Sequence, residues 1–173
     1  TLRAPLLLGD LRMLSVALLL LSIASGLFGS SNSYSNFNMT FFWIVILLGY
    51  TYWIALFGNS YDSVNPWRAI VRAVQVYLPG AFAGRRPYPA WLAYTPALLL
   101  YMALVWLELF GDMRPLSLSV MLIGYTAITF AGAWWWGSQA WFQYCDAFGV
   151  FFRVIGKISP LEWSGAGVRI RQP

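Results

Sequence analysis

The chain has 173 residues, of which 60% are hydrophobic and 10% are charged, and its formal net charge is +5. An ordinary soluble domain carries about a quarter charged residues, so this composition excludes a soluble domain and indicates an integral membrane protein. The chain has no His and one Cys. These counts exclude an internal disulfide, a Ser-His-Asp triad and a His-ligated metal or haem, so we expect no metal and no cofactor.

Two apolar runs near the start predict a pair of membrane-spanning helices. They are Leu11–Gly29 and the uncharged Met39–Phe57, and a span needs about 20 apolar residues. The first run follows a basic residue, as a signal peptide would, but the second run follows almost at once. This pattern favours a retained hairpin of two spans.

The stretch DSVNPWRAI, residues 62–70, predicts a change of chain direction at the membrane surface. Asn65 is a good helix cap, and Pro66 suits the first helical position because its missing N–H needs no partner there. Apolar residues then recur with helical spacing over residues 67–78, which predicts an amphipathic helix lying along the interface. We interpret this corner as architectural and not catalytic. Its residues are Asp62, Asn65, Pro66 and Trp67.

Two further apolar runs, Trp91–Phe110 and Leu116–Trp136, predict the third and fourth spans. Trp residues stand at the ends of several spans, where an indole ring is typical of the boundary between lipid and water. We therefore interpret them as interfacial anchors. The tryptophans concerned are Trp43, Trp53, Trp91 and Trp134.

The segment 139–158 leaves two interpretations open. Its polar residues share a narrow stripe of one helix, and the preferred interpretation is an interfacial or half-embedded helix that ends at Pro160. The alternative is a fifth span, since twenty residues reach about 30 Å. In that case Asp146 and Arg153 would form an intramembrane charge pair, and such residues are functional candidates. The candidate polar stripe is Gln143, Asp146 and Arg153.

The distribution of basic residues predicts the orientation of the four spans. Ten of the eleven Lys and Arg residues fall on the side that holds both termini, and Arg114 alone falls on the other. Basic loops stay in the cytoplasm, so we expect both termini inside. Basic residues near an anionic leaflet bind lipid or a partner. The candidates are Arg68, Arg72, Arg85, Arg86, Arg153 and Lys157.

A weak internal repeat runs through what we expect to be a single transmembrane helical domain, residues 1–173. Residues 11–78 and 91–158 each contain two spans followed by a helix with an acid and later basic residues. Two such units would be related by an axis along the membrane normal, as in parallel transporter repeats. The sequence thus predicts an all-α integral membrane protein with four transmembrane helices, a fifth as the alternative, and one or two cytoplasmic-side amphipathic helices.

Four stretches carry a family resemblance: NPWRAIVRAV, RRPYP, WLELF and DAFGVFFRVIGKISPLE. In this order they resemble a family of bacterial polytopic membrane proteins related to fenitrothion hydrolase. Many relatives have Glu where this chain has Asp146, and they are longer at both ends. Since the chain also begins with Thr1, we expect a fragment, a processed form or a traceable part of a longer protein. The resemblance implies the membrane architecture, a bacterial cytoplasmic (inner) membrane as the location, and an organophosphate hydrolase activity.

Two classes of function follow. The first is an accessory or structural subunit of a larger membrane assembly, without catalytic chemistry of its own, whose partners are membrane lipids and other membrane subunits. The alternative is a membrane-bound hydrolase of organophosphate-type esters, in which Asp62 or Asp146 positions water and Arg68 or Arg153 holds the phosphoryl group. A small transporter built on the repeat ranks third. We expect no nucleic-acid partner, since lipid better explains the basic surface.

Overall fold

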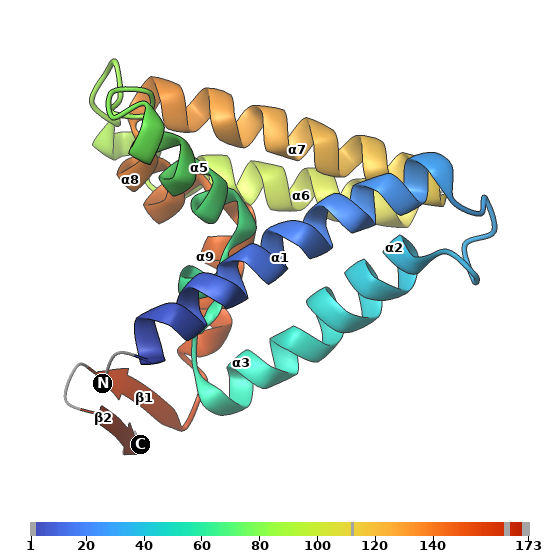
Figure 1. Ribbon diagram of the computed structural model, residues 1–173, viewed down its shortest axis with the longest axis horizontal. Coiled ribbons are helices and arrows are strands. Elements are labelled where there is room, and N and C mark those ends of the chain that lie inside the picture. Colours follow the sequence, from blue (N-terminus) through green and yellow to red (C-terminus); the bar gives the residue numbers. More distant parts are fainter. Residues whose placement is uncertain (1–2, 112, 165–166, 171–173) are drawn as a thin grey trace.

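Four helices that are long and apolar enough to cross a membrane form the body of the molecule (Figure 1). The computed structural model describes residues 3–111, 113–164 and 167–170. The protein is therefore an all-α integral membrane protein, as its composition predicts. The candidate spans are Leu7–Phe28, Phe37–Phe57, Ala90–Phe110 and Pro115–Trp136.

The helices themselves differ little from the predicted runs. The first helix begins earlier than predicted and so includes Asp10. The second span is continuous but contains a π-helical stretch, η1, and the third span begins with a single 3₁₀ turn, η2. The elements are α1 (Arg3–Phe28), α2 (Phe37–Met39), η1 (Thr40–Tyr50), α3 (Thr51–Phe57), η2 (Ala90–Leu92), α6 (Thr95–Phe110) and α7 (Pro115–Trp136).

At one end of the molecule the spans lie close together, and at the other they splay apart (Figure 1). At the close end, the Asn38 side-chain amide donates to the main-chain oxygen of Pro115 at 2.8 Å and to the Ser119 hydroxyl at 3.2 Å. These bonds tie the second span to α7. At the splayed end, on the left of Figure 1, shorter helices lie between the long ones, and both chain ends lie on this side.

The predicted corner and amphipathic helix are present at the splayed end. A short helix, α4 (Tyr61–Val64), leads into α5 (Pro66–Tyr77). The side-chain oxygen of Asn65 accepts the main-chain N–H of Arg68 at 3.0 Å, and Pro66 is the first residue of α5. As predicted, an Asn cap and a Pro start the helix. Helix α5 contacts α1, and its buried Trp67 donates its indole N–H to the Thr126 hydroxyl of α7 at 2.9 Å.

The segment 139–158 differs from both interpretations that its sequence allowed. It is not one helix but three pieces: α8 (Ser138–Ala140), the π-helical turn η3 (Trp141–Cys145) and α9 (Ala147–Gly156). The break falls at Asp146, whose backbone is extended. The longest piece has 10 residues, and at about 1.5 Å per residue it is too short to cross a bilayer. The fifth-span alternative is therefore wrong, and so is the single helix.

The reason for the break is that this segment packs inside the splayed bundle and not along its surface. Helix α9 contacts both α3 and α6. Phe148 stacks on Trp67 with ring centroids 5.6 Å apart, and it meets Tyr125 edge-on at 5.0 Å. Phe152 is fully buried and lies against Tyr61 at 4.7 Å. An aromatic core thus buries one side of α9, whereas Val154 is 55% exposed.

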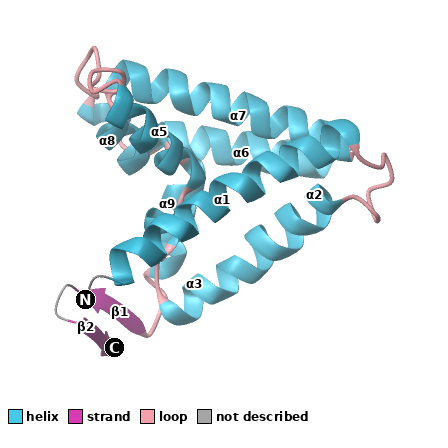
Figure 2. Ribbon diagram, in the orientation of Figure 1, coloured by secondary structure: helices cyan, strands magenta, loops and turns pink. Residues whose placement is uncertain are grey.

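A short β-hairpin follows α9, which the sequence did not lead us to expect (Figure 2). Strands β1 (Leu161–Ser164) and β2 (Gly167–Ile170) are antiparallel, and Leu161 faces Ile170 across the ladder. Strand β1 contacts α3. It keeps the described C-terminal segment at the splayed end.

Candidate functional site

Asp146 lies at the centre of a buried junction. Its side chain is 1% exposed. One carboxylate oxygen accepts the Asn65 amide at 2.7 Å, and the other accepts the Tyr125 hydroxyl. Burial raises the pKa of Asp146 above its ordinary value, although both hydrogen bonds oppose that rise. Asn65 also caps α5. Its side chain therefore joins the start of α5 to the break before α9.

Gly149 fits closely against this junction. A Cβ atom at position 149 would lie 2.6 Å from Oδ2 of Asp146, which is closer than such atoms approach in proteins. The first turn of α9 therefore has room for the carboxylate only because residue 149 has no side chain.

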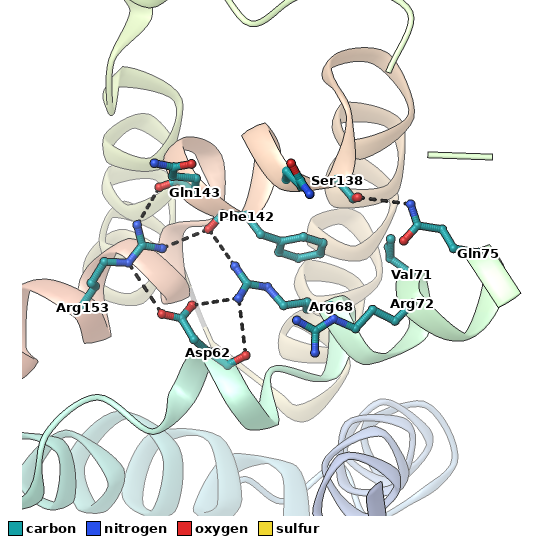
Figure 3. Close-up of a pocket in the computed structure, with 10 residues that line it drawn as sticks. Asp62, Arg68, Val71, Arg72, Gln75, Ser138, Phe142, Gln143 and Arg153 are labelled. Carbon is teal, nitrogen blue, oxygen red and sulfur yellow. Dashed lines mark hydrogen bonds and ion pairs between the residues drawn. The ribbon is translucent and has the colours of Figure 1, made fainter. Parts of the chain in front are cut away.

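A second group of polar residues surrounds a cavity of about 570 Å³ between α5, α8, η3 and α9 (Figure 3). We call it the basic cavity, because three of its side chains are guanidinium groups and one is a carboxylate. The lining residues are Asp62, Arg68, Val71, Arg72, Gln75, Ser138, Gln139, Phe142, Gln143 and Arg153.

Asp62 pairs with basic residues from two different helices. Its Oδ1 lies 3.4 Å from Nη1 of Arg68, and its Oδ2 lies 3.8 Å from Nε of Arg153. The Asn59 amide also donates to Oδ2, at 3.0 Å. The side chain of Asp62 is 36% exposed, so the cavity reaches the molecular surface. Asp62 thus links α4, α5 and α9.

Main-chain oxygens at the end of η3 bind the same two arginines. Arg153 donates to the oxygen of Gln143 at 2.8 Å and to that of Phe142 at 3.0 Å. Arg68 donates to the Phe142 oxygen at 3.4 Å, and its guanidinium lies 5.2 Å from the centre of the Phe142 ring. The last oxygens of a helical turn have no partner within it and carry partial negative charge. These two arginines therefore hold the broken segment against α5.

Arg72 differs from its two neighbours. It lines the basic cavity but has no hydrogen bond or ion pair with any residue that the structure describes. Its pKa is lowered, first by burial and then by the positive charges of Arg12 and Arg68. Arg72 is thus a cation in an already basic environment.

The remaining basic candidates lie outside the cavity. The guanidinium of Arg85 lies 3.8 Å from the ring centre of Trp134, and that of Arg86 lies 5.6 Å from Trp135. These contacts fasten the loop before η2 to the end of α7. Lys157 follows α9 and does not line the cavity. The structure thus brings Arg68, Arg72 and Arg153 together and separates them from the other three.

The candidate polar stripe is divided by the break at Asp146. Gln143 and Arg153 line the basic cavity, whereas Asp146 points into the core toward Asn65 and Tyr125. The role of Tyr125 was missed in the sequence, as was that of Phe142. A buried acid in an apolar segment needs hydrogen-bond donors, and this requirement was the available signal for Tyr125.

Catalytic and metal-binding groups are few. No cluster of three His, Cys, Asp or Glu side chains occurs among the described residues. The single cysteine, Cys145, is buried, and burial is the main cause that raises its pKa to about 11. At neutral pH it is a thiol and not the thiolate that attacks substrates or binds metals.

The four spans and the internal polar contacts define the class of this protein as an all-α integral membrane protein. Comparison of the chain with protein-family models, curated proteins and solved structures finds no match. The resemblance to the family related to fenitrothion hydrolase therefore stays a prediction.

Proposed function

We propose that the chain is an accessory or structural subunit of a larger membrane assembly, without catalytic chemistry of its own. The observation that carries this proposal is that the internal charged groups bind other parts of the same chain. Asp146 is enclosed by hydrogen bonds, and Asp62 and Arg153 join one helix to another. Groups that hold helices together in this way support a structural role.

The outer faces of the spans support a second part of the proposal, that other membrane subunits and lipids are the partners. Helix α6 presents a row of large apolar side chains, of which Leu99 is 63% exposed and Leu109 is 69% exposed. Only 11% of the apolar window in this span is buried inside the molecule. Lipid chains or a neighbouring span would cover this face in a membrane.

We further propose a bacterial cytoplasmic membrane, with both termini on the cytoplasmic side. The arginines of the basic cavity and those of the loop before η2 lie at the splayed end, where the start of α1 and the β-hairpin also lie (Figure 1). The positive-inside tendency then supports a cytoplasmic location for this end.

Site-specific photo-crosslinking tests the partner proposal. A photoreactive residue at Leu99, on the exposed face of α6, should give one crosslinked product with another membrane subunit in intact membranes. The same residue at Leu104, which is buried, is the matched control and should crosslink only within the chain. The subunit identified by mass spectrometry should also co-migrate with the chain on a native gel. Lipid adducts alone at Leu99, with a chain that migrates by itself, would contradict the proposal.

A hydrolase is the second candidate, because Asp62 and three arginines line one cavity. A carboxylate can position water, and guanidinium groups can hold a phosphoryl group. Asp146 does not line this cavity, so the test uses Asp62→Asn. Loss of hydrolysis of an organophosphate ester by a folded, fully associated variant would favour the enzyme. If neither the wild type nor the variant hydrolyses the ester, the subunit proposal is favoured.

A further inference from the structure

The basic cavity carries more positive charge than its own carboxylate can balance. Arg68, Arg72 and Arg153 contribute three positive charges, and Asp62 contributes one negative charge. Among the described residues, Asp62 forms its ion pairs with Arg68 and Arg153. A surplus of two positive charges therefore remains around one cavity that opens to the molecular surface.

Several hydrogen-bond donors of the cavity are not used by the described residues. The guanidinium of Arg72 has no partner there, and the same holds for the side-chain amides of Gln139 and Gln143. By contrast, Arg68 and Arg153 are held in place by main-chain oxygens. The site thus combines two fixed cations with one cation and two amides that are available to a ligand.

The size and place of the cavity narrow the class of ligand. A volume of about 570 Å³ is within the range of small-molecule sites and exceeds the needs of a simple ion. A phosphate monoester carries about −1.5 to −2 charges at neutral pH, which matches the surplus of the cavity. Its oxygens also suit the planar fork of an arginine, which can donate two parallel hydrogen bonds.

We propose that the basic cavity binds the phosphomonoester group of an anionic ligand, with Arg72 as the residue that contacts it directly. Gln139 and Gln143 donate to the remaining oxygens, and Arg68 and Arg153 supply positive charge from positions that Asp62 and η3 fix. The group belongs either to a soluble phosphate or to a lipid headgroup, since the splayed end of the bundle lies at the membrane boundary.

The test compares two variants of the full chain purified in a mild nonionic detergent. Arg72→Gln removes the proposed contact without removing any hydrogen bond to a described residue. Arg85→Gln is the matched control, because it removes an equal charge outside the cavity, above Trp134. Circular dichroism and size-exclusion chromatography establish that both variants keep the wild-type fold. Inorganic phosphate is titrated calorimetrically at constant ionic strength, and retention of phosphatidic acid is measured by native mass spectrometry.

We expect Arg72→Gln to weaken binding about tenfold, as loss of a charged hydrogen bond does, and Arg85→Gln to change it less than about twofold. Binding of inorganic phosphate would identify a soluble ligand, whereas retention of phosphatidic acid alone would identify a lipid headgroup. The proposal fails if the wild type binds neither probe. It also fails if Arg72→Gln binds as tightly as the wild type, or if Arg85→Gln is weakened as much. None of these results depends on a partner subunit.

Discussion

The two acidic corners of this protein, at Asp62 and at Asp146, have similar sequences but opposite environments. Each acid precedes a short helix with later basic residues, which is why the sequence predicts a repeat. Asp62 is partly exposed and pairs with guanidinium groups. Asp146 is buried, and its hydrogen bonds come from neutral donors, among them the side chains of Asn65 and Tyr125 and the main-chain N–H of Gly149. The comparison teaches that burial, and not the local sequence pattern, determines which partners each carboxylate has.

The partners of the arginines also differ between the two corners. By analogy with Asp62 and Arg68, the repeat pairs Asp146 with Arg153. In the structure Arg153 crosses to Asp62 instead, and Asn65 from the first corner crosses to Asp146. Each corner therefore depends on a residue of the other, and the two halves are joined by polar contacts. Whether the halves arose by duplication stays a prediction.

The largest effect is expected from removing the buried acid. Asp146→Ala leaves the Asn65 amide and the Tyr125 hydroxyl without an acceptor, and each buried unpaired group costs about 1–3 kcal/mol. The free energy of unfolding should fall by about 4 kcal/mol, which equilibrium unfolding in mixed detergent micelles would measure. Asp146→Asn keeps one acceptor oxygen, so its free energy of unfolding should fall by less. Since Asn has nearly the size of Asp, equal loss in both variants would show that the acceptor that Asn keeps contributes nothing to stability.

A somewhat smaller loss is expected at Asn65, which serves both corners. Asn65→Ala removes a helix cap worth about 1 kcal/mol and leaves one oxygen of Asp146 without its donor, for a total of about 3 kcal/mol. Asn65→Ser provides the comparison, because Ser can cap α5 but is too short to reach Asp146. The difference between the two variants measures the cap alone. If both variants were as stable as the wild type, the link between the corners would be disproved.

Glycine substitutions test how tightly the Asp146 corner is packed. Gly149→Ala places a Cβ atom 2.6 Å from the Asp146 carboxylate, and overpacking of this kind should cost about 2 kcal/mol. Gly124→Ala, within α7, meets no atom within 4 Å and should be neutral or stabilising by up to about 1 kcal/mol. Thermal melting of the two variants side by side measures the contrast. Similar melting temperatures would argue against a closely packed junction.

The smallest effect is expected at the exposed corner. Asp62→Asn removes ion pairs that water partly screens, so the unfolding free energy should change by less than about 1 kcal/mol. The same unfolding experiment as for Asp146→Asn gives the direct comparison of the two acids. A loss at Asp62 that equals the loss at Asp146→Ala would remove the distinction between the corners.

The sequence by itself determined the class of the protein and its four spans. Long apolar runs such as Met39–Phe57 cannot leave the membrane without exposing their side chains to water, whatever the rest of the chain does. The start of α5 was equally predictable. Asn65 and Pro66 act through their own backbone and through a residue three positions away, so their effect is local.

Only the tertiary structure decided the break at Asp146, the partners of the two acids and the basic cavity. The bond from Asn65 to Asp146 joins residues 81 positions apart, and no local spacing specifies such a contact. Helical periodicity placed Gln143, Asp146 and Arg153 on one stripe, but the aromatic core admits Asp146 and leaves the other two at the cavity. The physical reason is that a buried carboxylate must find donors, and the packing of α5 and α7 around α9 determines where those donors lie.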